Sequence, residues 1–336
     1  MSADSIILPD MPVIEGLRFR FICGEQDADT LYAVHAGRIA HDAVDPLSTF
    51  EDLPSRDDLC TSLSQAVAAG QQNQWLVAQV QDRVVGYSQI EHWSEDDGTW
   101  VYLILGWVLP EWRRQGIGTT MLHWCENTAR HLAATQHPNE KFEFAANASS
   151  TEQDTTALLL HEGYYAGYTV LEMGWDTLAP LPVPILPAGI EVHPVLPEHY
   201  SLIAASVGAA YQNEYAENRF QETFDSMDYA ARLSAPKHDP TLWQVAWDGD
   251  QVVGQVLSLI ENGQAEVFEV SVRPAWRRHK LARALLSRAM RCLHERGVEV
   301  VRLYTVAEFR TRASDLYRSV GFRVLKEFPR YRKSPA

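Results

Sequence analysis

Short, mainly apolar runs bounded by polar turns mark several strands in the second half of the chain. These runs are Leu242–Trp247, Val252–Ile260 and Ala265–Val272. They are separated by Asp-Gly at Asp248-Gly249 and Asn-Gly at Asn262-Gly263, the strongest short signals for a hairpin. The pattern therefore predicts an antiparallel meander.

A helical stripe follows the meander. Apolar residues recur at 281, 285, 286, 289 and 293, which predicts a helix from Leu281 to Arg296 that Gly297 ends. The other predicted elements of this half are a strand at Ile190–His193, a mainly helical segment at Pro197–Tyr215, a strand at Val298–Thr305, a helix at Ala313–Val320 and a strand that begins with Phe322–Leu325. This order predicts an α/β fold with helices packed on a mixed, mostly antiparallel central sheet.

The same order of features occurs twice along the chain. Trp75–Gly86 matches Trp243–Gly254, and Val108–Gly118 matches Val272–Ala282. His161-Glu-Gly-Tyr164 likewise matches Ser319-Val-Gly-Phe322, and four prolines at 180–187 between the copies forbid a helix there. We therefore predict two tandem domains, residues 1–178 and 189–336, joined by a proline-rich linker at 179–188.

Composition narrows the class of protein. The 336 residues are 46% hydrophobic and 22% charged, which is typical of a globular protein. A formal net charge of −15 disfavours binding to nucleic acid. No apolar run is long enough to span a membrane, no signal peptide is evident, and the four cysteines form no CxxC pair. We therefore expect a cytoplasmic protein with reduced thiols.

The charge is unevenly divided between the halves. Residues 1–180 hold 9 basic and 26 acidic residues, a net charge of −17, whereas residues 181–336 hold 20 and 18, a net charge of +2. An anionic ligand should therefore prefer the second half.

A basic loop follows a strand and opens a helix in both copies. The loops read Arg113-Arg-Gln-Gly-Ile-Gly118 and Arg277-Arg-His-Lys-Leu-Ala282. The free backbone N–H groups and the dipole at a helix start favour a phosphate, and glycine lets the backbone come close to it. Only the first copy keeps both glycines, because the second has Lys280 and Ala282 in their place. Neither HExxH nor a Cys/His cluster with zinc spacing occurs, so no metal is expected.

These loops, the preceding hairpins and the element Leu316-Tyr-Arg-Ser-Val-Gly-Phe322 together resemble the GNAT acetyltransferase superfamily, and specifically its two-copy members. The resemblance implies acetyl-CoA as co-substrate and catalysis in the C-terminal copy. It implies that acetyl-CoA in the second half contacts Val270, Ser271, Val272, Arg277, Arg278, His279, Lys280, Leu281, Ala282 and Arg283. By the same reasoning, CoA in the first half would contact Gly106, Trp107, Val108, Arg113, Arg114, Gln115, Gly116, Ile117, Gly118 and Thr119.

Acetyl transfer to an amine needs two proton movements. An alkylammonium, with a pKa of about 10.4, must lose a proton before it can attack, and the departing thiolate must gain one. The resemblance assigns the second role to Tyr317 and the first to Glu266, with Glu269 as a weaker candidate base. Strand alternation places Glu266 and Glu269 on opposite sides unless a bulge intervenes. By simple counting, the first copy has Tyr102 and Leu159 at the positions of the base and the acid.

Two functions remain open at this stage. The first is an N-acetyltransferase that moves an acetyl group to a small-molecule primary amine by direct attack. The alternative is a non-catalytic acyl-CoA-binding or interaction module that uses the N-terminal domain. The sequence leaves open the acceptor, whether the first copy binds CoA, how Lys280 affects affinity, and whether the chain is a monomer or a dimer.

Overall fold

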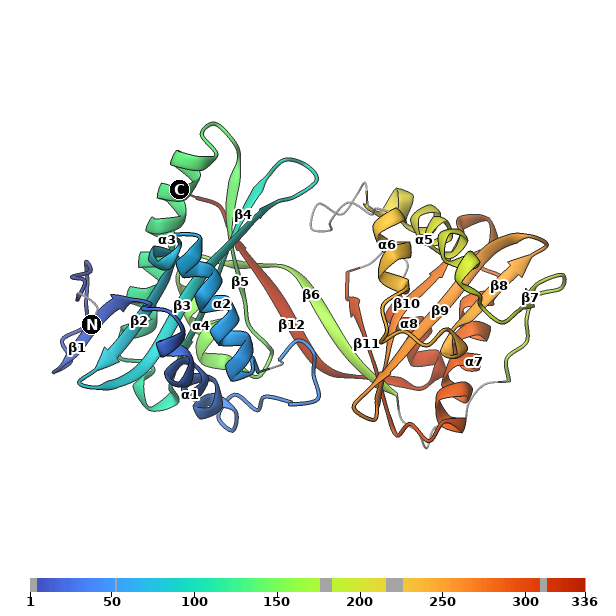
Figure 1. Cartoon of the computed structure of the whole chain (residues 1–336), viewed down its shortest axis with the longest axis horizontal. Coiled ribbons are helices and arrows are strands. Elements are labelled where there is room, and N and C mark those ends of the chain that lie inside the picture. Colours follow the sequence, from blue (N-terminus) through green and yellow to red (C-terminus); the bar gives the residue numbers. More distant parts are fainter. Residues whose placement is uncertain (1–4, 52, 176–182, 216–225, 309–312, 336) are drawn as a thin grey trace. The chain divides into compact units, whose positions relative to one another are not determined.

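The computed structural model describes residues 5–51, 53–175, 183–215, 226–308 and 313–335. The chain forms two compact units (Figure 1). Unit 1 comprises Met1–Gly167 together with Phe328–Ala336, and unit 2 comprises Tyr168–Glu327. None of the helices in the described ranges has the length and apolarity needed to cross a lipid bilayer.

Unit 1 is an α/β sandwich around strands in the order β1-β2-β3-β4-β5-β12. Its elements are β1 (Leu17–Phe21), α1 (Ala28–Arg38), α2 (Arg56–Ala68), β2 (Trp75–Val80), β3 (Arg83–Ser94), β4 (Trp100–Val108), α3 (Ile117–Gln136), β5 (Phe142–Asn147), α4 (Gln153–His161) and the end of β12 (Phe322–Lys333). Alternate residues of β2 supply two cores: Val77 packs with α1 and α2, and Leu76 packs with α3. Helices therefore cover both faces of the strands.

Unit 2 repeats this arrangement, with strand order β6-β11-β10-β9-β8-β7. Its elements are most of β6 (Tyr165–Trp175), β7 (Glu191–Val192), α5 (Tyr200–Tyr215), α6 (Ser226–Leu233), β8 (Gln244–Asp248), β9 (Gln251–Glu261), β10 (Gln264–Val272), α7 (Leu281–Glu295), β11 (Val300–Val306) and α8 (Ala313–Val320). Figure 1 shows α7 on the opposite side of β8–β10 from α5 and α6. At the β9–β10 turn, Asn262 and Gly263 have φ values of 51° and 79°, as the Asn-Gly signal predicts.

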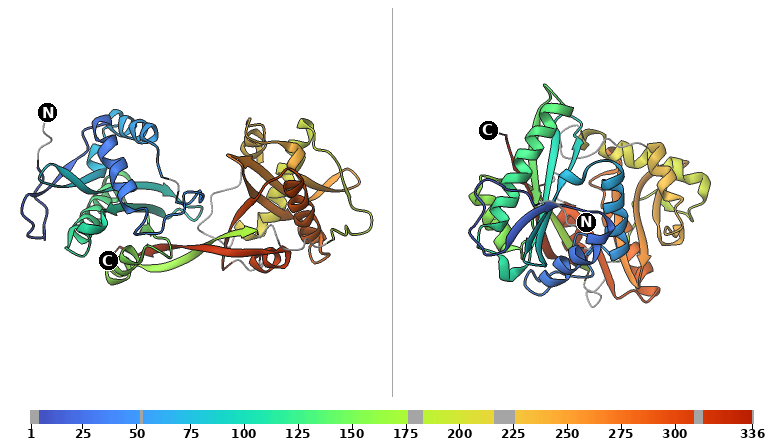
Figure 2. Two further views of the ribbon diagram at one scale, coloured as in Figure 1. Left: turned by 90° about the horizontal axis from the view of Figure 1, so that it is seen from below. Right: turned by 60° about the vertical axis from the view of Figure 1, so that its left-hand side comes forward.

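The two copies exchange their last strands. β6 ends the first copy in sequence, but its residues from Val170 to Trp175 pair with β11 of the second copy. β12 ends the second copy, but Arg330–Lys333 pair with β5 of the first. The compact units therefore differ from the sequence boundaries 1–178 and 189–336 by one strand at each end (Figure 2). Of the expected linker, residues 183–188 form neither helix nor strand, and residues 179–182 lie outside the described ranges.

The central strands of each unit fork at one point. In unit 1, β4 and β5 run parallel and pair only as far as Ile104 and Ala146, although β4 continues to Val108. In unit 2, the parallel pairing of β10 and β11 stops at Glu266 and Arg302, although β10 continues to Val272. Beyond each fork the strand runs into the basic loop, so the fork lies beside the residues that the sequence marks for binding.

Candidate functional site

The two basic loops share a left-handed backbone pattern. Arg114 and Gly116 have φ values of 60° and 90°, and Arg278 and Lys280 have values of 68° and 64°. Left-handed residues that alternate with right-handed ones turn successive N–H groups toward one concavity, which binds anions. Each loop leads directly into the N-terminus of α3 or α7, where the helix dipole also favours an anion. Lys280 thus adopts the conformation of Gly116, with a Cβ in a region that L residues visit at a cost.

The first arginine of each loop holds the loop against its strand. Nε of Arg113 donates to the carbonyl oxygen of Val108 at 2.8 Å, and Nε of Arg277 donates to that of Val272 at 2.9 Å. Arg277 also donates from Nη2 to the carbonyl oxygen of Ala210 at 2.6 Å. These two side chains have a positioning role, which the sequence pattern did not indicate.

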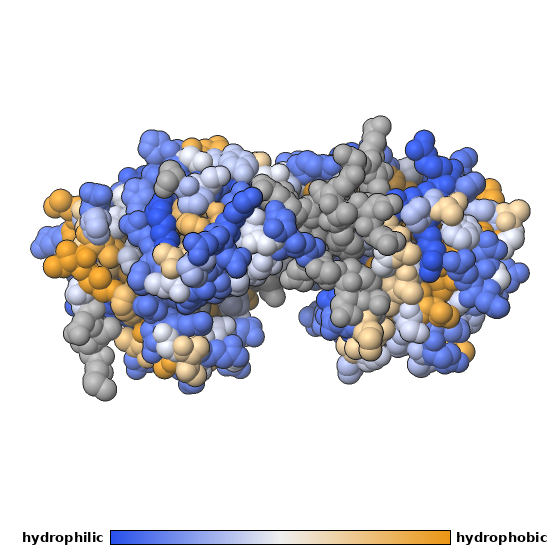
Figure 3. Space-filling model, turned by 90° about the horizontal axis from the view of Figure 1, so that it is seen from above, coloured by the Kyte–Doolittle hydropathy of each residue, from blue (hydrophilic) through white to orange (hydrophobic). Residues whose placement is uncertain are grey.

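The other loop residues divide by burial. The side chains of Ile117 and Leu281 lie in the core, so only their backbone groups can face a ligand. Arg278, His279, Lys280 and Arg283 are exposed and leave positive charge around the second loop. Figure 3 shows mostly hydrophilic residues over the visible face of each unit.

A β-bulge in β10 corrects the predicted strand alternation. Val267 lies opposite Ser258 and Glu269 opposite Leu257, so Phe268 is the extra residue. Directly opposed residues share a face of the sheet. Glu266 faces the same way as Leu259 and Glu269 the same way as Leu257, which places both carboxylates on one face. The regular alternation that would put them on opposite sides does not hold, because the bulge that the sequence left open lies between them.

The bulge also changes how the two copies correspond. β4 pairs with β3 without a register shift from Gly86–Val108 to Ser94–Trp100. Counting along this regular strand from Val108, the partner of Glu266 is Leu103 rather than Tyr102, and the partner of Glu269 is Leu105. The first copy still lacks a carboxylate at either place.

Glu266 lies at the fork between β10 and β11, half-buried. Burial raises the pKa of its carboxyl group; nearby Lys237 lowers it, and Glu261 and Glu172 raise it further. No hydrogen bond or ion pair to this carboxylate is found among the described residues. It is therefore available to a ligand and binds a proton more readily than an ordinary glutamate.

Glu269 is buried and held by hydroxyl groups. Its Oε1 accepts a hydrogen bond from the Tyr211 hydroxyl at 3.1 Å, and its Oε2 accepts one from Tyr229 at 3.3 Å. Burial raises its pKa, whereas hydrogen bonds from Ser271 and the two tyrosines lower it. No sequence signal pointed to Tyr211 and Tyr229, because α5 and α6 approach β10 only in the folded chain.

Tyr317 lies on α8 with only 7% of its surface exposed. Its ring packs edge-on against Phe322 with centroids 6.1 Å apart. Burial raises the pKa of the phenol above its ordinary value, and the negative charge of Glu269 raises it further. Its hydroxyl makes no hydrogen bond to any described residue. The phenol therefore keeps its proton at neutral pH and has a donor to offer to a ligand.

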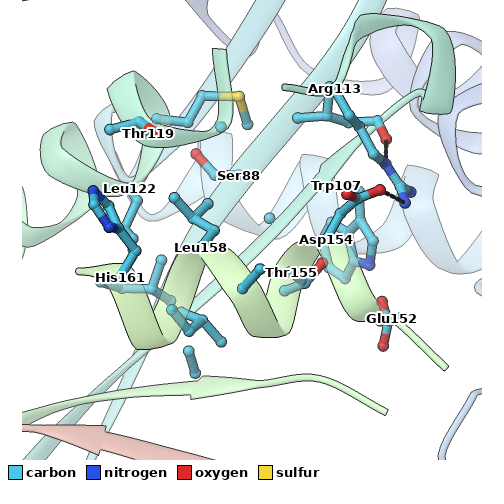
Figure 4. A pocket seen from close by; sticks show the side chains of 18 of the residues that line it. Ser88, Trp107, Arg113, Thr119, Leu122, Glu152, Asp154, Thr155, Leu158 and His161 are labelled. Carbon is cyan, nitrogen blue, oxygen red and sulfur yellow. Dashed lines mark hydrogen bonds and ion pairs between the residues drawn. The ribbon is translucent and has the colours of Figure 1, made fainter. Parts of the chain in front are cut away.

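Unit 1 contains a cavity of about 510 Å³ at its fork (Figure 4). Eight of the residues predicted for CoA in the first half line it: Gly106, Trp107, Val108, Arg113, Arg114, Gly116, Gly118 and Thr119. Leu159 lies in the wall, at the position that corresponds to Tyr317. Arg113 makes a two-pronged ion pair with Asp42, at 2.6 and 2.8 Å, in the same wall. The cavity thus has the predicted loop but no proton donor at the tyrosine position.

A scan against known families matches the acetyltransferase (GNAT) family model twice, at residues 42–142 and 204–322. The chain belongs to the GNAT acetyltransferase family. The two matches fall in the two copies, and this GNAT chain is an acyl-CoA-dependent acetyltransferase.

Curated relatives and solved structures agree with this GNAT assignment along nearly the whole chain. Mycothiol acetyltransferase of Kineococcus radiotolerans is 31% identical, over 84% of this chain and 89% of its own. That of Cellulomonas flavigena is 27% identical, over 88% and 82%. A GCN5-related N-acetyltransferase from Sphaerobacter thermophilus shares the fold, with a TM-score of 0.70 at 22% identity over 98% of this chain and 97% of its own. A tandem GNAT protein from the clavulanic acid biosynthesis pathway also shares the fold, with a TM-score of 0.59 at 16% identity over 95% of this chain and 99% of its own.

Proposed function

We propose that unit 2 carries the catalysis and moves an acetyl group from acetyl-CoA to a primary amine by direct attack. One observation carries this proposal: a carboxylate and a phenol, neither bonded to another described residue, occur together in unit 2. Glu266 and Tyr317 are these groups, whereas the matching positions of the first copy are Leu103 and Leu159. A leucine can neither accept nor donate a proton.

The second loop suits the diphosphate of acetyl-CoA. Its backbone N–H groups turn toward one side at the start of α7, and exposed Arg278 and Lys280 add positive charge. The edge of β10 from Val270 to Val272 lies beyond the fork, where β11 no longer pairs with it. That edge can pair with the amide groups of the pantetheine arm.

The proton movements follow from the two side chains. Glu266 takes a proton from the ammonium group of the acceptor, because a carboxylate with a raised pKa is a better base. The amine nitrogen then forms a bond to the acetyl carbon as the carbon–sulfur bond breaks, and it loses its second proton to solvent. Tyr317 donates its proton to the departing sulfur, so CoA leaves as a neutral thiol. Glu266 then gives its proton to solvent and Tyr317 takes one from solvent, so that one proton is released in each turnover.

The acceptor belongs to the class of small-molecule amines. The relatives are named mycothiol acetyltransferases, which supports an amine on a small thiol-containing compound. Two carboxylates on one face of β10 favour an acceptor that arrives as a cation. Within this class, aminoglycosides, polyamines, amino acids and amino-sugar thiols are all compatible with this chemistry.

The test is a panel of these amines incubated with the full chain and acetyl-CoA, with acetylated product detected by mass spectrometry. We expect at least one acceptor to gain 42 Da, the mass of an acetyl group replacing hydrogen, and expect Tyr317→Phe to slow that reaction. Transfer that persists at the wild-type rate in both Tyr317→Phe and Glu266→Gln would remove unit 2 from the chemistry. Binding of acetyl-CoA by unit 1 with no transfer to any amine would favour a non-catalytic module.

A further inference from the structure

The basic loop of unit 1 is occupied by carboxylates of its own chain. Asp154, the second residue of α4, points toward the loop from the cavity wall (Figure 4). Its Oδ2 lies 3.7 Å from Nη1 of Arg113 and 3.3 Å from Nε2 of His41, and its Oδ1 lies 3.6 Å from Nη1 of Arg114. One carboxylate therefore lies beside the side chains of His41, Arg113 and Arg114 at the loop where a phosphate would bind.

A second carboxylate completes this arrangement. Asp42 is 2% exposed and accepts hydrogen bonds from both terminal nitrogens of Arg113, as described above. Nη1 of Arg38 lies 3.5 Å from Oδ2 of Asp42 and 3.2 Å from Oε1 of Glu152. Glu152 also lines the cavity. The arginines of this network are Arg38, Arg113 and Arg114, and its acids are Asp42, Glu152 and Asp154. The formal charge of the network is zero, in a half of the chain that carries −17.

The loop of unit 2 differs in the sequence that surrounds it. Arg277 corresponds to Arg113 and donates hydrogen bonds to the backbone carbonyls of Val272 and Ala210. In sequence, Asp154 lies nine residues before Gly163, and the residue nine before Gly321 is Arg312. Arg312 lies outside the described residues, but its charge is opposite to that of Asp154. The two copies thus differ in the sign of the charge at this position.

We propose that Asp154 is an internal anion that excludes the CoA diphosphate from unit 1, so that the chain holds acetyl-CoA only in unit 2. A CoA diphosphate at the first loop would bring like charges together beside Asp154, which is strongly unfavourable in a partly buried wall. It would also have to break the ion pairs that already satisfy the loop arginines. The cavity is still lined by the basic loop, but the arginines of that loop are paired with carboxylates of the chain itself. This inference goes beyond the proposed function, because the chemistry in unit 2 does not depend on it.

Hydrogen–deuterium exchange of the full chain with and without CoA tests this proposal. In the wild type we expect CoA to protect the amides of 277–283 and to leave 113–119 unchanged. In Asp154→Asn, and more so in Asp154→Arg, we expect protection at 113–119 as well, with affinity there raised on the order of tenfold to a hundredfold. Asp82→Asn is the matched control, since it removes one carboxylate from the exposed surface of the same unit and should leave 113–119 unprotected.

Protection of 113–119 in the wild type would overturn the proposal, and so would two Asp154 variants that leave this loop unprotected. Thermal unfolding of each variant shows whether unit 1 is still folded. A chain whose 277–283 amides also stay unprotected contradicts the proposed function instead, so the two failures are distinguishable. Acetyl transfer by the Asp154 variants should stay at the wild-type rate.

Discussion

Replacing Tyr317 with phenylalanine removes one oxygen atom and leaves the ring in place. The ring packs against Phe322 in the core, and that contact is kept. The hydroxyl makes no hydrogen bond to a described residue, so its loss should change the free energy of unfolding by less than about 1 kcal/mol. Without the phenol, CoA must leave as a thiolate or take its proton from water. We expect kcat to fall roughly 10- to 1000-fold, equivalent to about 1.4–4.1 kcal/mol of lost transition-state stabilisation.

The assay is the initial rate of CoA formation, resolved by chromatography, at saturating acetyl-CoA and acceptor. Tyr331→Phe is the control, because Tyr331 is also a buried tyrosine but lies in unit 1, where its hydroxyl is 3.4 Å from Thr156. This control should keep the wild-type kcat. An unchanged kcat in Tyr317→Phe would refute the role of the phenol. A fall in kcat that accompanies a large fall in melting temperature would show that the oxygen acts in folding, which contradicts the packing described here.

Three further predictions concern Glu266, the two basic loops and a buried ion pair. Glu266→Gln should move the pH of the highest rate upward. In the wild type, activity rises as pH increases through the raised pKa of Glu266, whereas the variant becomes active only where the amine itself loses its proton. A pH–rate profile that does not move would transfer the role of base to Glu269. Lys280→Gly should stabilise the chain by about 0.5–1 kcal/mol in thermal unfolding by relieving the left-handed backbone, whereas the reciprocal Gly116→Lys should destabilise it; the opposite order would refute this view of the loop. Arg302→Met should cost roughly 3–5 kcal/mol in urea unfolding, because it leaves the fully buried Glu172 without its cation; a cost below about 1 kcal/mol would contradict the buried pair.

Most of the fold could be predicted from sequence because its signals are local. The Asn-Gly turn, the helical stripe that begins at Leu281 and the glycine after it all fix elements within a few residues. The exchange of the final strands could not be predicted. β6 and β12 have the same alternating pattern whichever neighbour they pair with, so the pattern carries no information about the partner. Helix α6 was also missed, because it is short and follows a polar segment.

The candidate site was predictable where a residue's type alone gives its role. The charge of the two loops and their place before a helix pointed to phosphate binding, whereas Tyr317 and Glu266 were assigned by the resemblance to the GNAT family, and the parts of all of them in binding and catalysis stay predictions. The relation between Glu266 and Glu269 could not be decided from sequence, since one bulged residue reverses the side of every residue beyond it. The partners of Glu269 and the carboxylates at Arg113 come from segments distant in sequence, so only the folded chain brings them together.

The most direct test of the whole account is a crystal structure of the full chain soaked with acetyl-CoA. The account predicts density at residues 277–283, with the thioester sulfur within about 3.5 Å of the Tyr317 hydroxyl. Acetyl-CoA found only in the cavity of unit 1, or a sulfur atom too far from the phenol to receive its proton, would contradict it.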